Sequence, residues 1–79
     1  QIRPFSAILV TDGGYYRAPI SANGEFRFFG LPAEDFSLTI RGSSGVTLSE
    51  GVTVSLEKGT YLGELTQGVW QVAPDAKQD

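Results

Sequence analysis

The sequence predicts an all-β protein: a small antiparallel Greek-key β-sandwich of six or seven strands, with no helix. Three observations predict this class. Apolar residues alternate with polar ones over short stretches, most clearly at residues 25–28 and 36–41. Turn dipeptides such as Asn23-Gly24 separate these stretches. No window carries apolar residues at helical spacing over the length that a helix needs.

The first expected strand, residues 5–11, is apolar on both faces. Alternation places Phe5, Ala7 and Leu9 on one face, and Ile8 and Val10 on the other. One face of each sheet in a two-layer sandwich usually meets water, so Ile8 and Val10 indicate a partner on that face. The alternative is that a loop or the C-terminal segment of the chain covers them.

Residues 15–21 form the second expected strand, with Tyr16, Ala18 and Ile20 on one face. Pro19 has no N–H to donate to a neighbouring strand. We therefore expect this strand at the edge of a sheet or at a bulge.

Residues 21–40 contain the clearest pattern of the chain. Asn23-Gly24 opens a turn, because both residues tolerate positive φ, and two apolar sets follow it. Phe29 points outward by alternation, unless a bulge near Gly30 turns it inward. The apolar sets are expected to share one core and consist of Phe26, Phe28, Phe36, Leu38 and Ile40.

The second half of the chain is less regular. Residues 41–45 predict a flexible connection, residues 46–49 a weak strand and residues 52–56 a half-buried strand. The facing of residues 60–66 is ambiguous, and residues 69–72 form a last strand or a flap. We expect one domain over residues 1–73 and a polar tail over residues 74–79.

The stretch N-G-E-F-x-F-x-G-L-P-A-x-D-F-x-L-x-I at residues 23–40 resembles the carboxypeptidase regulatory-like domain. That family has a transthyretin-like (prealbumin-like) β-sandwich fold and is related to B-type repeats of bacterial surface proteins. Residues 4–9 and 51–54 are similar to two further strands of the family, so the resemblance spans most of residues 4–65. It implies a non-catalytic module outside the cytoplasm: secreted, periplasmic or on the cell surface.

The chain departs from the family pattern in three places. Glu34 stands where the family usually has Gly, so the backbone there must suit a side chain or be strained. The opening G-x-V-x-D strand has no counterpart before Pro4, which predicts an open sheet edge that a strand of another chain can pair with. Residues 69–72 are not required by the family pattern.

Composition narrows the classes of function. The 79 residues carry a net charge of −3, and the six Lys and Arg residues do not cluster, which disfavours nucleic acid. No apolar run has the length of a membrane span, so no membrane insertion is expected. The chain starts at Gln1 and has no Met, which we attribute to processing or to excision from a longer protein.

We expect no enzyme and no cofactor. The sequence has no His and no Cys, which removes the commonest general base, the thiol nucleophile and the usual transition-metal ligands. Glu34 and Asp35, with Glu25, are oxygen donors for calcium, but their spacing favours a solvated turn and no metal site. Lys58 and Lys77 lie in a turn and in the tail, which disfavours the internal isopeptide bond of some B-type repeats.

Two functions remain in competition. The first is an interaction or spacer module that contacts other protein chains or neighbouring domains of its parent protein. The second is carbohydrate binding by exposed aromatic rings, with Trp70, Tyr15 and Tyr16 as candidates and Arg17 or Glu64 as polar partners; Trp70 and Tyr61 alternatively plug the ends of the sandwich. The candidate interaction residues are Ile8, Val10, Tyr15, Phe29 and Trp70.

Overall fold

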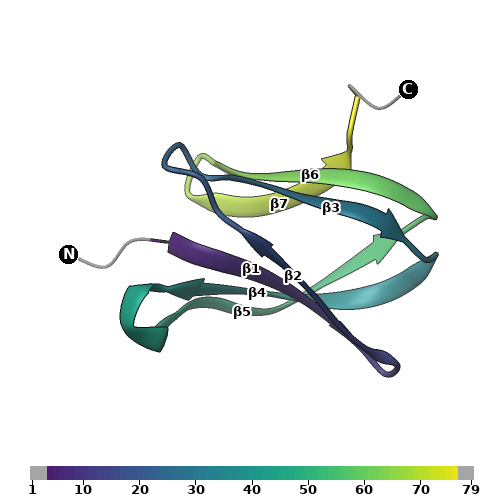
Figure 1. The fold of residues 1–79 in the computed structure, drawn as a ribbon, viewed down its shortest axis with the longest axis horizontal. Coiled ribbons are helices and arrows are strands. Elements are labelled where there is room, and N and C mark those ends of the chain that lie inside the picture. Colours follow the sequence, from purple (N-terminus) through teal and green to yellow (C-terminus); the bar gives the residue numbers. More distant parts are fainter. Residues whose placement is uncertain (1–3, 77–79) are drawn as a thin grey trace.

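A computed structural model of the chain describes residues 4–76, which form two antiparallel sheets packed face to face (Figure 1). One sheet has four strands in the order β2-β1-β4-β5, and the other has three in the order β3-β6-β7. The strands are β1 (Pro4–Thr11), β2 (Gly14–Pro19), β3 (Glu25–Leu31), β4 (Glu34–Gly42), β5 (Thr47–Leu56), β6 (Gly59–Thr66) and β7 (Val69–Pro74).

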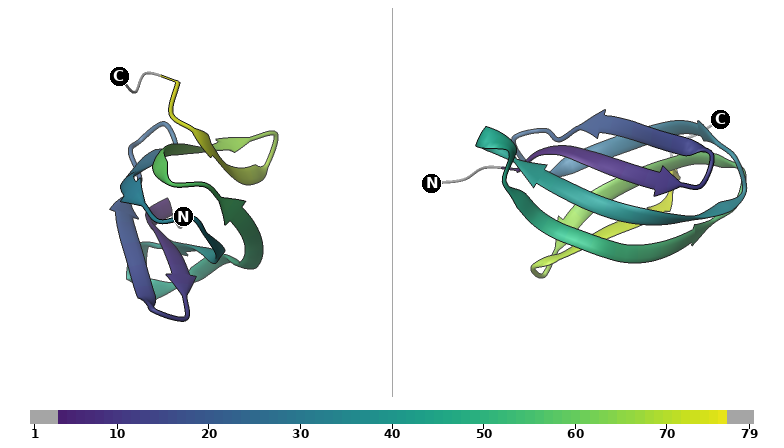
Figure 2. Two further views of the ribbon diagram at one scale, coloured as in Figure 1. Left: turned by 90° about the vertical axis from the view of Figure 1, so that its right-hand side faces the viewer. Right: turned by 90° about the horizontal axis from the view of Figure 1, so that it is seen from below.

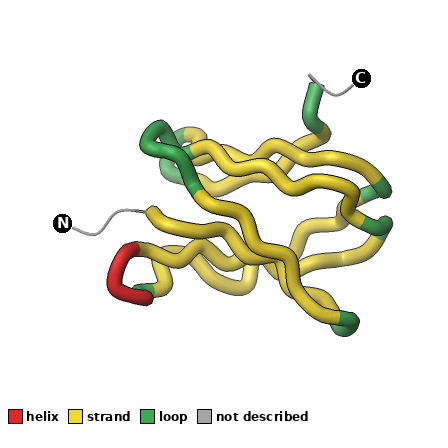
Figure 3. Tube along the Cα trace, viewed as in Figure 1, coloured by secondary structure: helices red, strands yellow, loops and turns green. Residues whose placement is uncertain are grey.

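This architecture confirms the predicted all-β sandwich. Figure 2 shows the four-stranded sheet from its outer side, with β1 and β4 adjacent although two strands separate them in the chain. Within residues 4–76 the only helical element is one 3-10 turn, Ser43–Gly45, at the end of β4 (Figure 3). No helix in this range is long and apolar enough to cross a membrane.

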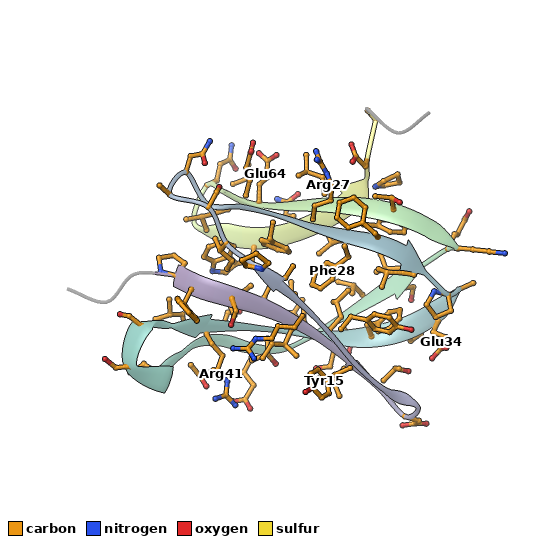
Figure 4. The ribbon with its side chains drawn as sticks, in the orientation of Figure 1. Tyr15, Arg27, Phe28, Glu34, Arg41 and Glu64 are labelled. Atoms are coloured by element: carbon orange, nitrogen blue, oxygen red, sulfur yellow. The ribbon has the colours of Figure 1, made fainter. Side chains whose placement is uncertain are left out.

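The core lies between the two sheets. The expected apolar sets from β3 and β4 are both buried and meet there, as predicted. Figure 4 shows Phe28 pointing into the space between the layers. The buried hydrophobic residues are Ala7, Leu9, Ala18, Phe26, Phe28, Leu31, Phe36, Leu38, Ile40, Leu56 and Tyr61.

The Asn23-Gly24 turn reverses the chain as predicted, but the strands on either side of it do not pair with each other. The Ser21 N–H donates to the Glu25 carbonyl at 2.8 Å, and Gly24 adopts φ +85°, which favours glycine. The strands on either side, β2 and β3, belong to different sheets. The turn therefore carries the chain from one layer of the sandwich to the other.

Phe5 was expected on the core face of β1 and is instead 59% exposed. The pairing of β1 with β4 shifts between Pro4 and Ser6, where β1 has one extra residue. Such a bulge breaks the two-residue period, so alternation counted back from Ala7 and Leu9 does not hold for Phe5.

One of the two predictions about sheet edges is confirmed, and the other does not hold for the first strand. β2 is an edge strand, as Pro19 predicted. β1 lies between β2 and β4, so the expected open edge is not on the first strand of residues 4–76. The three-stranded sheet is the narrower one, with β3 and β7 at its edges.

β5 is one ten-residue strand where a weak strand and a half-buried strand were expected. Its pairing with β4 shifts between Leu38 and Ile40 and again between Ile40 and Arg41. These irregularities explain why no single alternation runs through residues 46–56.

Glu34 is not among the residues with positive φ, so it fits the turn without backbone strain.

The C-terminal end of the fold extends past the predicted boundary at residue 73. β7 continues to Pro74, and the Asp75 N–H donates to the Thr60 carbonyl at 3.0 Å. Arg27 Nε lies 2.8 Å from Asp75 Oδ2, an ion-pair contact without hydrogen-bond geometry. Residues 1–3 of the predicted domain and residues 77–79 of the predicted tail lie outside the described residues.

Tyr61 resolves the ambiguous facing of residues 60–66. Its ring is buried, and its hydroxyl donates to the Glu57 carbonyl at 2.7 Å and accepts from the Glu57 N–H at 2.8 Å. The Tyr61 hydroxyl thereby satisfies the N–H and the C=O of Glu57, in the turn between β5 and β6. Tyr61 thus closes one end of the sandwich, the role that the alternative to carbohydrate binding gave to this residue.

Candidate functional site

Three of the five candidate interaction residues meet on the outer face of the four-stranded sheet. Val10 pairs directly with Tyr15, so both side chains lie on the same side of the sheet. Ile8 shares this side, because Ala7 and Leu9, its neighbours along β1, point into the core. Val10 is 44% exposed and Tyr15 is 68% exposed.

Two arginines flank this apolar group. Arg17 pairs with Ile8 across β1 and β2, and Arg41 pairs with Ser6 across β1 and β4. Figure 4 shows Tyr15 and Arg41 on the same outer side of the sandwich. We call this surface the Tyr15 face and define it as Ile8, Val10, Tyr15, Arg17 and Arg41.

The Tyr15 face surrounds an open depression of about 520 Å³. Its floor comes from β1 and its walls from the outward-facing residues of β2, β4 and β5. Glu50 of β5 adds a carboxylate to the wall opposite Tyr15. The other lining residues are mostly short and polar: Ser6, Thr11, Asp12, Gly14, Thr39 and Thr47.

This arrangement suits binding by contact. Tyr and Arg are enriched at protein interfaces, since each combines a large apolar surface with a polar end. The aliphatic side chains of Ile8 and Val10 offer area to bury, and two guanidinium groups offer donors to carboxylates. Of the five residues that define the Tyr15 face, only Tyr15 is of a type that acts as a general base or a nucleophile in enzymes.

The other two candidate residues lie elsewhere. Phe29 is 71% exposed on the outer face of the three-stranded sheet, beside Arg27 and Leu62. Trp70 is half-buried in β7, with its ring tilted against Phe26 at 6.1 Å between ring centroids. Neither residue contributes to the Tyr15 face.

The residues proposed for sugar stacking do not form one platform. Tyr15 points outward, whereas its neighbour Tyr16 points inward and meets Phe36 edge-to-face at 5.9 Å. Trp70 faces the core from the other sheet. Figure 4 places Glu64 on the side of the sandwich opposite Tyr15.

The acidic residues weighed for calcium are separated. Glu34 accepts a hydrogen bond from Thr11 Oγ1 at 2.6 Å, and Asp35 accepts one from Ser55 Oγ at 2.7 Å. Glu25 begins β3 and so lies at the opposite end of that strand from the turn before Glu34. Within residues 4–76, no three acidic side chains are grouped closely enough to hold a metal ion.

The sequence did not single out Arg41 or Glu50. Their place beside Ile8 depends on β1 pairing with β4 and on β4 pairing with β5. The first of these contacts joins strands that are far apart in the chain, and no local pattern reports it. The only available signal was the outward position of Arg41 in the alternation of residues 36–41.

Comparisons with protein-family models, with curated proteins and with solved structures give no match to this chain. The fold and the geometry of the Tyr15 face therefore carry the functional argument.

Proposed function

We propose that this chain is a non-catalytic protein-interaction module whose Tyr15 face binds another protein chain or a neighbouring domain. One observation carries the proposal: Val10 and Tyr15 are exposed, and Ile8 is half-buried beside them, on the outer face of the four-stranded sheet. The C-terminal segment, which was one alternative to cover Ile8 and Val10, forms β7 of the three-stranded sheet on the other side of the core.

The chemistry of the face indicates the chemistry of its partner. An apolar centre flanked by Arg17 and Arg41 suits a surface with an apolar centre and carboxylates at its rim. Glu50, on the opposite wall, favours a basic group at that side of the partner. The partner is thus a protein surface with charges of both signs arranged around an apolar patch.

The resemblance to the carboxypeptidase regulatory-like domain supports a module that works outside the cytoplasm. It rests on the G-L-P turn and the aromatic alternation around it, together with a two-sheet antiparallel fold. The lack of His and Cys in the sequence favours a role without catalysis.

Site-specific crosslinking tests the proposal. A photoreactive phenylalanine analogue replaces Tyr15 on the proposed face, and in a control protein it replaces Phe29, which is equally exposed on the outer face of the other sheet. Irradiation in an extract of the source cells should give one crosslinked polypeptide from position 15 and none of the same mass from position 29.

Two outcomes would contradict the proposal. Equal crosslinking from both positions would mean that the Tyr15 face has no special role. Binding to a polysaccharide array that is lost in Tyr15→Ala, with no polypeptide crosslinked, would favour the carbohydrate alternative.

A further inference from the structure

The inner face of β5 is not fully covered by the other sheet. Val52 pairs with Leu38, which is completely buried, so both side chains point toward the interior. Val52 is nevertheless 42% exposed. The three-stranded sheet therefore does not reach β5 at Val52, where the apolar interior is open to solvent, although Leu56 at the end of the same face is buried.

The strand that borders this opening is β7. The opposite edge strand of its sheet, β3, lies against β2, so β7 is on the side of β5. Val54 of β5, together with Trp70 and Val72 of β7, packs against the margin of the core and stays only partly buried. Apolar side chains from both sheets thus line an opening that is one strand short of closure.

The free edge of β7 carries unpaired backbone groups. The Asp75 N–H donates to Thr60, which means that the backbone of Pro74 points away from β6. The register of β7 with β6 has no shift, so the N–H and C=O groups of Trp70 and Val72 also point away from β6. No strand within residues 4–76 pairs with them.

The other three edge strands carry features that discourage strand addition. β2 contains Arg17, β3 contains two charged residues and a register shift, and β5 contains Glu50 and two register shifts. Charged side chains and bulges are the usual protections of an edge. β7, with the sequence V-W-Q-V-A-P, has neither, and its proline, Pro74, stands at the last position of the strand, beyond Trp70 and Val72.

We propose that β7 accepts an extended segment of a partner polypeptide as a fourth strand of its sheet. The segment would lie about 4.8 Å from β7 and bond to the N–H and C=O groups of Trp70 and Val72. Its alternate side chains, which are apolar, would cover Val52 and Val54. This site is separate from the Tyr15 face and does not depend on it.

A second copy of this chain fits the site poorly. The matching edge of the copy is its own β7, and a symmetric β7–β7 pair would bring together two sandwiches in which β5 projects past β7. The two β5 strands would then compete for the same space. A strand from a different chain has no such conflict.

A displayed peptide library tests the site, with the whole chain as the target. The library consists of peptides of about ten residues with random apolar residues at alternate positions. Enriched peptides should slow amide exchange at Trp70 and Val72 at least about tenfold, because these amides gain acceptors. Exchange at Gln71 and Ala73, whose amides already face β6, should change far less.

Matched substitutions separate this site from the Tyr15 face. Val52→Thr should weaken peptide binding about tenfold or more, whereas Val10→Thr, which changes an equally exposed valine on the Tyr15 face, should leave it unchanged. Val72→Pro removes a free-edge N–H and should abolish binding, whereas Arg17→Pro on the β2 edge should not. If Val72→Pro does not fold, the amide-exchange data and the comparison of Val52→Thr with Val10→Thr still test the proposed site.

Three results would overturn the proposal. The first is a library that yields no enriched peptide. The second is binding without protection of Trp70 and Val72. The third is a concentration-dependent dimer with the same protection, which would make a second copy of the chain the occupant.

Discussion

Gly63 is the position where a single added methyl group should test the packing most severely. It lies in the middle of β6, paired with Phe26 on one side and Val72 on the other. A Cβ atom built on Gly63 would lie 2.0 Å from Cε2 and 2.3 Å from Cζ of the Phe26 ring. Ordinary contacts between carbon atoms are about 3.5–4.0 Å, so the whole ring would have to move by about 1.5 Å.

The Phe26 ring has little room for that movement. It is buried, lies edge-to-face on Phe28 at 5.8 Å, and contacts Trp70. Adding a methyl group to a well-packed core costs about 1–3 kcal/mol, whereas Gly→Ala at an unstrained site gains about 0.4–1 kcal/mol. With a displacement this large, we expect a net loss of about 2 kcal/mol, or about 8–16 °C in Tm.

Urea denaturation measures this loss, and the fluorescence of Trp70, the single tryptophan, reports on the same contact. Gly13→Ala is the matched control, because a Cβ atom there meets nothing within 4 Å and φ is not positive. Phe26→Leu removes the ring atoms that clash, so Gly63→Ala should cost much less in that background. A Gly63→Ala protein as stable as the Gly13→Ala protein would refute the packing described for Phe26.

Three further substitutions test other contacts by the same denaturation assay. Tyr61→Phe should lose about 1–3 kcal/mol, because both backbone groups of Glu57 lose their partner; an unchanged midpoint would mean that water replaces the hydroxyl. Asp75→Asn should lose about 0.2–1 kcal/mol, since Arg27 is partly exposed, and the loss should shrink in high salt; no loss at low salt would contradict the ion pair. Phe5→Ser should stay within about 0.5 kcal/mol of the original chain, and a loss of 2 kcal/mol or more would place Phe5 in the core after all.

The core was predictable because its strands alternate cleanly. Phe36, Leu38 and Ile40 follow each other at a period of two, and all three are buried. Phe26 and Phe28 obey the same rule in β3. Each of these positions is set by local backbone geometry, which a sequence pattern reports directly.

Positions beside a bulge could not be predicted in this way. Phe5 points out of the core because β1 has one extra residue beside it. The two register shifts in β5 interrupt its alternation, so one strand was predicted as two separate segments. A bulge depends on how the neighbouring strand fits, so it leaves no fixed mark on the sequence of its own strand.

The candidate site was predictable in part. The two-sided alternation of β1 identified Ile8 and Val10, and the Asp12-Gly13-Gly14 turn brings Tyr15 back beside them, as adjacent strands commonly do. Arg41 joins them through a pairing of strands that are distant in the chain. Trp70 turned inward because β7 completes the second sheet, a contact that the sequence left open as a strand or a flap.

Calorimetric titration of three variants with the polypeptide that crosslinks to position 15 tests most directly the proposal that the Tyr15 face binds a protein partner. Tyr15→Ala and Val10→Thr change the proposed face, and Phe29→Ala removes an aromatic ring that is equally exposed on the opposite sheet. We expect Tyr15→Ala to raise Kd about 30-fold or more, as loss of a central interface residue does, Val10→Thr to raise it less, and Phe29→Ala to leave it unchanged. Loss of binding in Phe29→Ala, with Tyr15→Ala unaffected, would contradict the assignment.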